Sequence, residues 1–302
     1  MATQQDNKGQ QPQPIPLTPE QQGLKNIKNY LNSDGIMQKF QQLLGKKSVG
    51  FITSVLQIVA NNDKLAVCDV QSLYNAAATA ATLDLPINPN LQFAHIVPYK
   101  QWKEVDGNRF QVSIAEFQCG WRGYIQLGQR TGQYSTINVT DVREGEVKKF
   151  DRLTGDVIFE WIDDEEERNK KKIIGYVSYF RLKSGFEKCI YWPLAKILAH
   201  GEKYSKTYKR ADSRWKTDED AMCRKTMIKK LLGDFGPMSV DVALAIAADQ
   251  SEVISLEEGK FHYPDNPNTD APKEEDEQER RGNQAQNGLN DLESKLSGNT
   301  AT

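Results

Sequence analysis

The segment Trp215–Leu232, with the sequence WKTDEDAMCRKTMIKKLL, constrains the fold more than any other stretch of the chain. At about 100° per residue its apolar side chains share one arc, which predicts a helix with one buried face. These side chains are Ala221, Met227, Ile228, Leu231 and Leu232. We expect Thr217 to cap this helix, because acidic residues follow in the first turn, where the helix dipole favours them. Lys225 and Lys229 lie one turn apart at the edge of the apolar arc.

A basic run with interleaved aromatic rings precedes this helix. Its cations are Lys203, Lys206, Lys209, Arg210, Arg214 and Lys216, and its rings are Tyr204, Tyr208 and Trp215. Cations mixed with aromatic rings beside an anchored helix are typical of a surface that binds a nucleic-acid strand. The alternative is a solvated cationic face that binds nothing.

The net charge of −2 conceals an asymmetry along the chain. Residues 251–302 contain 12 acidic and 5 basic side chains, whereas residues 1–250 contain 29 acidic and 34 basic ones. A basic body with an acidic tail indicates a polyanionic partner. Residues 1–22 are rich in Gln and Pro, which is typical of disorder. We therefore predict a disordered tail at 1–22, one folded domain at 23–250, and a disordered acidic tail at 251–302.

Hydrophobic periodicity predicts helices in the N-terminal part of the chain, ahead of the strands. Helical spacing covers residues 24–44, where Gly35 is expected to separate two helices, and then residues 49–60 and 69–83. Asp69 is a good cap for the last of these. Its small side chains allow close packing, either within the fold or between subunits. They are Ala77, Ala80 and Ala81.

Alternating patterns then predict a β-hairpin and an antiparallel sheet. Residues 91–99 and 110–114 alternate around the turn signal Asp106-Gly107. Further strands are expected at 134–142, 157–162, 173–182 and 186–192, and short helices at 194–200 and 240–248. The fold class is therefore α+β.

Two segments beside these elements carry further cations. The expected loop of the hairpin contains Lys100 and Trp102, and the ring either stacks on a base or covers an apolar edge. The segment Gly120–Thr131 is predicted to form a helix with Arg122 and Arg130 on its polar side. The glycines at its start either let the backbone approach a phosphate or only relieve crowding.

Several kinds of chemistry are disfavoured by the sequence. The ATP-binding pattern GxxxxGK[ST] is missing, because Phe40 stands where the first glycine before Gly45-Lys46-Lys47-Ser48 belongs. The cysteines are far apart, so zinc is not expected. The acidic residues Asp141 and Glu146 with Lys148 suggest a metal-dependent nuclease, but their spacing is short. We see no signal peptide and no membrane span, and expect a cytosolic protein.

Four blocks in order resemble one known family. They are LPINPNLQFAHIVPY, FQCGWRGYIQLGQRTGQ, VREGE (Val142–Glu146) and the segment from Trp215 onward, WKTDEDAMCRKTMIKKL. This succession resembles the RecT family of phage single-strand annealing proteins, over about residues 24–250. The two tails are not covered by the resemblance.

The resemblance implies a function and a fold. It implies ATP-independent annealing of complementary DNA strands during phage-type recombination, with oligomers in the form of rings or helical filaments. It also implies no catalytic activity, no bound cofactor beyond Mg²⁺ that assists DNA binding, and a 5′→3′ exonuclease as a partner, with a host single-strand-binding protein as a further one. The fold is expected to be similar to that of the eukaryotic strand-annealing mediators, with a hairpin and sheet against a long helix.

On this basis we predict a groove between the long helix and the hairpin that holds phosphates. The predicted DNA-binding residues are Lys100, Gln118, Arg122, Arg130, Lys206, Lys209, Arg210, Arg214, Lys216, Lys225, Thr226 and Lys229. Arg224 points near the apolar arc, so we expect it to be a buried, paired residue instead. Contacts to the backbone alone would leave the bases available for pairing. We expect subunits to pack through the Ala-rich helix or the N-terminal helices, and the acidic tail to dock a partner.

Overall fold

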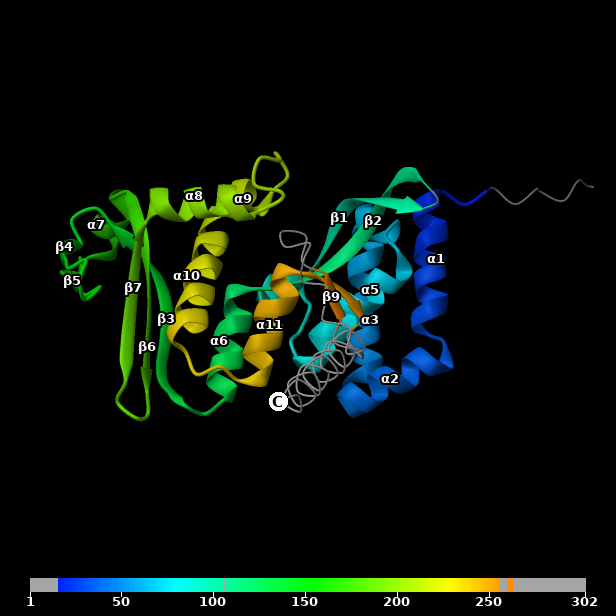
Figure 1. The fold of residues 1–302 in the computed structure, drawn as a ribbon, viewed down its shortest axis with the longest axis horizontal. Coiled ribbons are helices and arrows are strands. Elements are labelled where there is room, and N and C mark those ends of the chain that lie inside the picture. Colours follow the sequence, from blue (N-terminus) through cyan, green and yellow to red (C-terminus); the bar gives the residue numbers. More distant parts are fainter. Residues whose placement is uncertain (1–15, 106, 256–259, 263–302) are drawn as a thin grey trace, which may run out of the picture.

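The computed structural model describes residues 16–105, 107–255 and 260–262. The fold class is α+β, as expected, with a helical N-terminal part, a long β-hairpin and a three-stranded antiparallel sheet beside a long helix. Figure 1 shows the sheet and the N-terminal helices at opposite ends of the molecule, with α6 (Trp121–Arg130) and α11 (Val240–Gln250) between them.

The N-terminal part consists of packed helices at the predicted positions. They are α1 (Pro19–Leu31), α2 (Asp34–Leu44), α3 (Ser48–Ala60), the short α4 (Asp63–Ala66) and α5 (Val70–Thr82), with 3-10 turns η1 (Gly45–Lys47) and η2 (Pro89–Leu91). The break between α1 and α2 precedes Gly35, which is helical. α1 begins inside the segment predicted to be disordered, because Thr18 forms a capping box with Gln21. The boundary at residue 22 was therefore placed too late.

Residues Asp34–Ala60 are long and apolar enough to suggest a membrane span by composition alone. The chain is not one straight helix there, because η1 and the positive φ of 55° at Gly45 separate α2 from α3. Ile36 and Phe40 of α2 and Val55 of α3 are buried in the core. Such a pair of core helices is weak support for a span.

The Ala-rich helix α5 is buried along nearly its whole length. Its cap is Asp69, as predicted, whose carboxylate accepts a hydrogen bond of 2.8 Å from the Ser72 N–H. Small alanine side chains let the hairpin and the other helices approach α5 closely. α5 therefore packs within the chain, and the suggestion that it joins subunits is wrong for this structure.

The hairpin of β1 (Ala94–Val105) and β2 (Asn108–Cys119) is longer than predicted. Lys100 is paired with Ser113 inside it, so the segment expected to be a loop is strand. The turn lies where predicted, with Val105 paired to Asn108 and a positive φ at Gly107.

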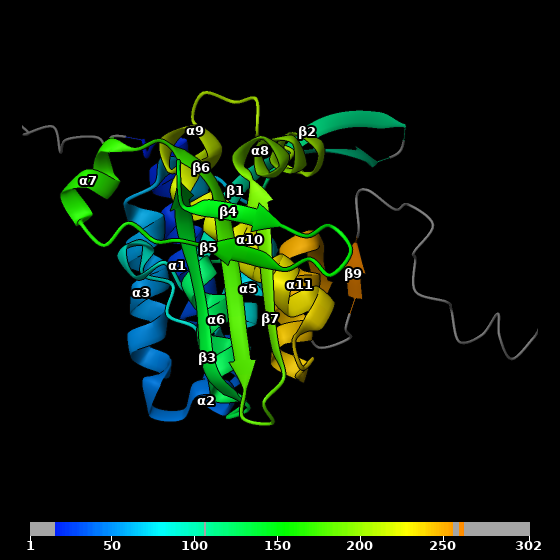
Figure 2. The same cartoon turned by 90° about the vertical axis from the view of Figure 1, so that its left-hand side faces the viewer.

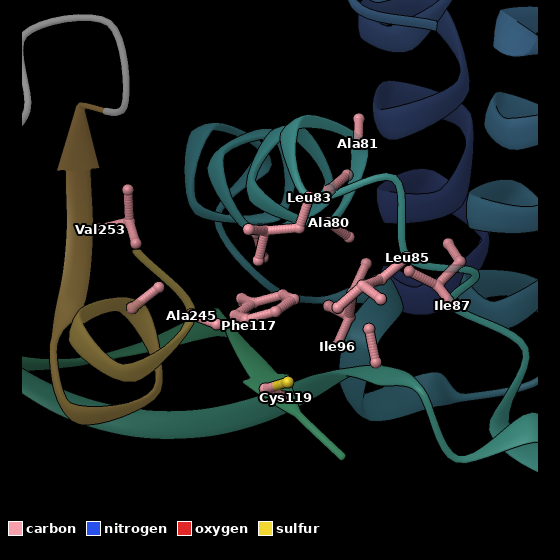
Figure 3. Packing of buried hydrophobic residues seen from close by; sticks show 14 of the residues in the cluster. Ala80, Ala81, Leu83, Leu85, Ile87, Ile96, Phe117, Cys119, Ala245 and Val253 are labelled. Atoms are coloured by element: carbon pink, nitrogen blue, oxygen red, sulfur yellow. The ribbon is translucent and has the colours of Figure 1, made fainter. Parts of the chain in front are cut away.

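The base of the hairpin packs on α5 rather than on the long helix that the sequence suggested. Figure 3 shows the ring of Phe117, from β2, between Leu83 at the end of α5 and Ala245 of α11. The hairpin is thus anchored by its base in the N-terminal core, while its outer half carries the exposed Trp102 and Phe110.

The sheet has the order β3-β6-β7. Its strands are β3 (Tyr134–Arg143), β6 (Ile173–Leu182) and β7 (Glu187–Pro193), close to the predicted ranges. A small hairpin of β4 (Val147–Phe150) and β5 (Val157–Phe159) lies across the outer face of the sheet, with α7 (Glu165–Lys170) beside it (Figure 2). β4 and α7 were not predicted, because their sequences are mostly charged.

The helix predicted at Trp215–Leu232 is split into two, the short α9 (Arg214–Thr217) and α10 (Glu219–Phe235). The helix α8 (Leu194–Tyr204) precedes them, and α10 packs on β6, β3 and α6. Asp218, and not Thr217, caps α10, because its carboxylate accepts from the Ala221 N–H. The predicted apolar arc is otherwise confirmed, since Met227, Ile228 and Leu231 are fully buried.

The folded part extends beyond the predicted boundary at residue 250. β8 (Glu252–Ser255) and β9 (Lys260–His262) form a small hairpin in the segment expected to be disordered. The buried amide of Asn75 in α5 donates to the carbonyl oxygens of Val253 and Ile254, at 3.0 and 2.8 Å. A fixed partner for these carbonyls explains why the strand is ordered despite the acidic sequence. Residues 263–302 lie outside the described part.

The glycines before and inside α6 serve chain packing. A Cβ on Gly120 would overlap the carbonyl oxygen of Gln92, and one on Gly123 would overlap that of Phe93. The close approach suggested by the sequence is therefore to the chain's own backbone, and not to a phosphate.

We predict that Gly123→Ala lowers the free energy of unfolding by about 1–3 kcal/mol, because backbone atoms must shift to admit the methyl group. Gly35→Ala is the control, since a Cβ there meets nothing within 4 Å, and helix propensity predicts no loss or a gain of up to about 1 kcal/mol. Urea denaturation of both variants checks this. Equal stability of the two would contradict the packing role of Gly123.

Candidate nucleic-acid interface

A groove with a volume of about 1260 Å³ runs between α10 and the hairpin. One wall is the exposed edge of α10, and the other is the base of the hairpin with residues 61–64 of the N-terminal part. The segment 204–215, which joins α8 to α9, lies at its rim, and the end of α11 lies at its floor. The described residues thus form a groove at the predicted position, between the long helix and the hairpin.

The two lysines of α10 that the sequence singled out lie at the floor of the groove. Lys225 and Lys229 donate to the two oxygens of one carboxylate, that of Asp249 in α11, at 2.6 and 2.7 Å. Lys225 also lies 3.3 Å from the side-chain oxygen of Gln118, on β2. The Asp249 side chain is only 4% exposed, so this ion pair is largely removed from solvent. Half of the charge of the lysine pair is therefore neutralised within the chain.

The cations at the rim are also paired, but in contact with solvent. Lys206 lies 3.8 Å from Glu116, and Arg214 lies 3.9 Å from Asp218. Asp212 joins two cations, because Arg210 and Lys64 both lie 2.8 Å from it. Exposed pairs of this kind contribute at most about 1 kcal/mol each. A phosphate group can replace such a carboxylate at little cost.

Other predicted contacts are placed away from the groove lining. Arg130 donates to the carbonyl oxygens of Leu83 and Asp84, at 2.6 and 2.7 Å, and so fixes the turn that follows α5. Its role is structural, because backbone carbonyls away from regular structure need donors. Lys100 is on the outer part of the hairpin.

Three more predicted cations make local contacts at the surface. Arg122 lies over the ring of Trp121, at 5.1 Å from its centre, and Lys216 lies 4.9 Å from the ring centre of Tyr208. Lys209 pairs with Glu202 at 3.2 Å. None of the three is among the described residues that line the groove.

The neutral residues of the prediction do line the groove. Gln118 donates to the phenol oxygen of Tyr99, at 2.6 Å, while its own oxygen faces Lys225. The hydroxyl of Thr226 donates to the Met222 carbonyl one turn earlier in α10, at 2.9 Å. Both side chains therefore already have partners, and Thr226 retains an oxygen that can accept.

Arg224 is a structural residue, as expected. It donates to Asp220 at 2.7 Å and to the Val139 carbonyl at 2.8 Å, and its guanidinium lies 3.4 Å from Asp141. Burial alone would lower the pKa of the guanidinium, but the hydrogen bond to Asp220 and the charges of Asp220 and Asp141 outweigh burial and raise it. The residue ties α10 to β3.

The acidic residues that suggested a nuclease belong to the same network of arginines. Asp141 pairs with Arg143 at 2.7 Å, and Glu146 pairs with Arg168 at 2.7 Å. Lys148 points elsewhere, to Glu160 at 3.0 Å. Guanidinium groups occupy the oxygens that a metal ion would need, and within the described residues no group of His, Cys, Asp and Glu has the arrangement of a metal site. The geometry disfavours the nuclease interpretation.

Two groove residues were missed by the sequence interpretation. Asp249 directly follows the short apolar helix predicted at 240–248, and Tyr99 was interpreted only as one of the residues on a strand face. Their roles depend on contacts between distant segments, such as the 2.6 Å contact from Lys225 to Asp249. The only local signal was an acidic side chain at the end of an apolar helix, which is too common to be informative.

His95, on β1, lines the groove as a neutral imidazole. Burial lowers its pKa to about 4, and the charges of Lys225 and Arg214 add to this, while Asp218 and Asp249 oppose it. The unfolded chain takes up this proton near pH 6.5. Between pH 6.5 and 4 the unfolded state therefore binds more protons than the folded state, and stability falls as the pH falls.

We predict that the wild-type chain loses about 2 kcal/mol of unfolding free energy through His95 between pH 7 and pH 5. His95→Gln should remove most of this loss, as measured by urea denaturation at the two pH values. His200→Gln is a second test of the same argument, because the pKa of that half-buried histidine is also lowered, first by burial and then by lysines, so this variant should also reduce the pH dependence. An unchanged pH dependence in His95→Gln would contradict the assignment.

Comparison with known proteins agrees with this geometry. Residues 50–263 match the RecT family. The chain is 37% identical over 271 residues to the uncharacterized protein YqaK of Bacillus subtilis strain 168, covering 85% of this chain and 88% of that protein. It is 23% identical over 192 residues to the protein RecT of Escherichia coli strain K12, covering 63% of this chain and 66% of that protein. The match spans both walls of the groove, and the chain belongs to the RecT family, whose membership supports a role in recombination by single-strand annealing.

Proposed function

We propose that this chain is a non-catalytic protein that anneals complementary single strands of DNA without ATP and without sequence preference. The observation that supports this most is the groove between α10 and the hairpin, lined by Lys206, Arg210, Arg214, Lys225 and Lys229, in a chain of the RecT family. Cations of this kind recognise the phosphate backbone, which is the same for every sequence.

The exposed ion pairs at the rim suggest how a strand enters. Phosphates would replace the exposed Asp212 as the partner of Arg210 and would bind the half-exposed Lys206 beside the mostly buried Glu116, while counterions leave the DNA. Exchange at an exposed pair costs little free energy, and it gives the strand only moderate affinity for the groove. Moderate affinity suits annealing, because the bases must turn outward and the product must be released.

The family resemblance suggests an assembly and partners. We propose that subunits form rings or helical filaments on DNA, in phage-type recombination, with a 5′→3′ exonuclease as a partner and a host single-strand-binding protein as a second one. Because α5 is buried, the N-terminal helices are the better contact between subunits, and Leu43 and Val49 are exposed there. The acidic tail remains the proposed partner-docking segment, and it lies outside the described residues. The location would be cytoplasmic, with no ATP and with Mg²⁺ only assisting DNA binding.

We predict that Lys206→Gln lowers the salt dependence of binding to single-stranded DNA. The slope of log affinity against log salt should fall by roughly 0.7, because one phosphate contact is lost. Lys148→Gln is the matched control, since Lys148 is 50% exposed and paired to Glu160, much as Lys206 is 48% exposed and paired to Glu116, but it lies outside the groove lining. Filter binding at several salt concentrations measures both. Equal slopes in the two variants would exclude Lys206 from the DNA site.

Annealing itself is tested with labelled complementary oligonucleotides, Mg²⁺ and no ATP. We expect full-length duplex to form much faster than without protein, for two pairs of unrelated sequence at similar rates. Shortened strands would favour the nuclease alternative, and an unchanged rate of pairing would refute the proposed function. Wild-type protein heated to unfold it serves as the control for non-specific aggregation.

A further inference from the structure

The contacts of Asp249 join its own helix, α11, to two other elements of the groove. Asp249 stands at the end of α11, its carboxylate accepts from Lys225 and Lys229 of α10, and it also accepts from the backbone N–H of Cys119, at the end of β2, at 3.2 Å. This places a fixed negative charge beside the two lysines at the floor of the groove, whose lining contains both cations and other carboxylates.

The carboxylate cannot leave this position as a rim carboxylate can. Its side chain is 4% exposed, and the side chains of Lys225 and Lys229 are 13% and 20% exposed. Breaking a buried pair leaves charges without partners in a poorly solvated place, which is strongly unfavourable. Asp212 and its partner Arg210, by contrast, are both about half exposed. A phosphate can displace Asp212 but not Asp249.

The charge of the floor therefore depends on Asp249 remaining ionised. Burial alone would raise the pKa of this carboxyl, but the charges and hydrogen bonds of Lys225 and Lys229 outweigh burial and lower it. With two ammonium groups and one carboxylate, the floor presents a net charge of one rather than two.

We propose that Asp249 is a built-in counterion, a positioning residue that fixes the two lysine head groups and halves the charge that the floor presents to a DNA strand. This inference rests on the proposed function, and it adds a residue that limits affinity. Limited affinity favours release of the annealed product, which a more strongly cationic floor would retain.

Two accounts of the floor make different predictions. In the first, the net charge of the floor determines the salt dependence of DNA binding. Asp249→Asn then makes the floor more positive, Lys229→Gln makes it neutral, and the double variant returns it to the wild-type charge. In the second, only the number of cations at the floor determines the salt dependence. Asp249→Asn then has the salt dependence of the wild type, and the double variant has that of Lys229→Gln. Filter binding of single-stranded DNA at one fixed pH separates the two accounts.

We expect the slope of log affinity against log salt to steepen by roughly 0.7 in Asp249→Asn and to fall by roughly 0.7 in Lys229→Gln. The double variant should match the wild type. Between 50 and 200 mM salt, a slope change of this size alters the loss of affinity by about 2.5-fold. Release of annealed duplex, followed by competition with unlabelled DNA, should be slower from Asp249→Asn than from the wild type.

Glu160→Gln is the control for removal of an acidic group elsewhere, because Glu160 pairs with Lys148 outside the groove lining. Its slope should stay at the wild-type value. Circular dichroism and thermal unfolding show which variants are folded. If Asp249→Asn does not fold, the double variant decides alone, because it retains one lysine and no buried carboxylate.

Each outcome is informative. Slopes that follow the cation count would overturn the counterion role while leaving DNA binding and annealing intact. Absence of DNA binding by the wild-type protein would instead refute the proposed function, which is a separate result from the failure of this inference.

Discussion

The buried ion pair of Asp249 with Lys225 and Lys229 is the interaction on which the groove depends. It joins α10, which carries the sheet, to α11 and to the end of β2, which belong to the hairpin side. Without it, two lysines one helical turn apart would lie at the floor with no counter-charge. Among the described residues, the walls would also lose the buried ion pair that joins them. The same interaction fixes the position of the groove and moderates its charge.

The structure separates two kinds of arginine that look alike in sequence. Arg224 and Arg130 lie within basic segments, yet both donate to backbone carbonyls and hold elements together. Arg210 and Arg214 at the rim pair only with exposed carboxylates. Burial therefore distinguishes cations that build the fold from cations that can exchange their partners. A groove made mostly of exchangeable pairs fits a protein that has to bind strands and then release them.

Local patterns predicted most of the helices and strands, because periodicity and capping act within a few residues. The apolar arc of α10 and the cap at Asp69 are examples. The errors arose where distant contacts decide: β8 depends on Asn75, and the structural role of Arg130 depends on Leu83, 47 positions away. The floor of the groove could be predicted from Lys225 and Lys229, but not their shared partner Asp249. No pattern within α11 reveals which side chain faces another helix.

The position of DNA in the groove is the central claim, and imaging the protein on single-stranded DNA by electron cryomicroscopy tests it most directly. The account predicts a strand between α10 and the hairpin, with phosphates at Lys206, Arg210 and Arg214 and with bases turned outward. Addition of the complementary strand should place the second strand on those bases, without further contacts to the floor. A strand found along α1–α3, or on the outer face of the sheet, would contradict the account.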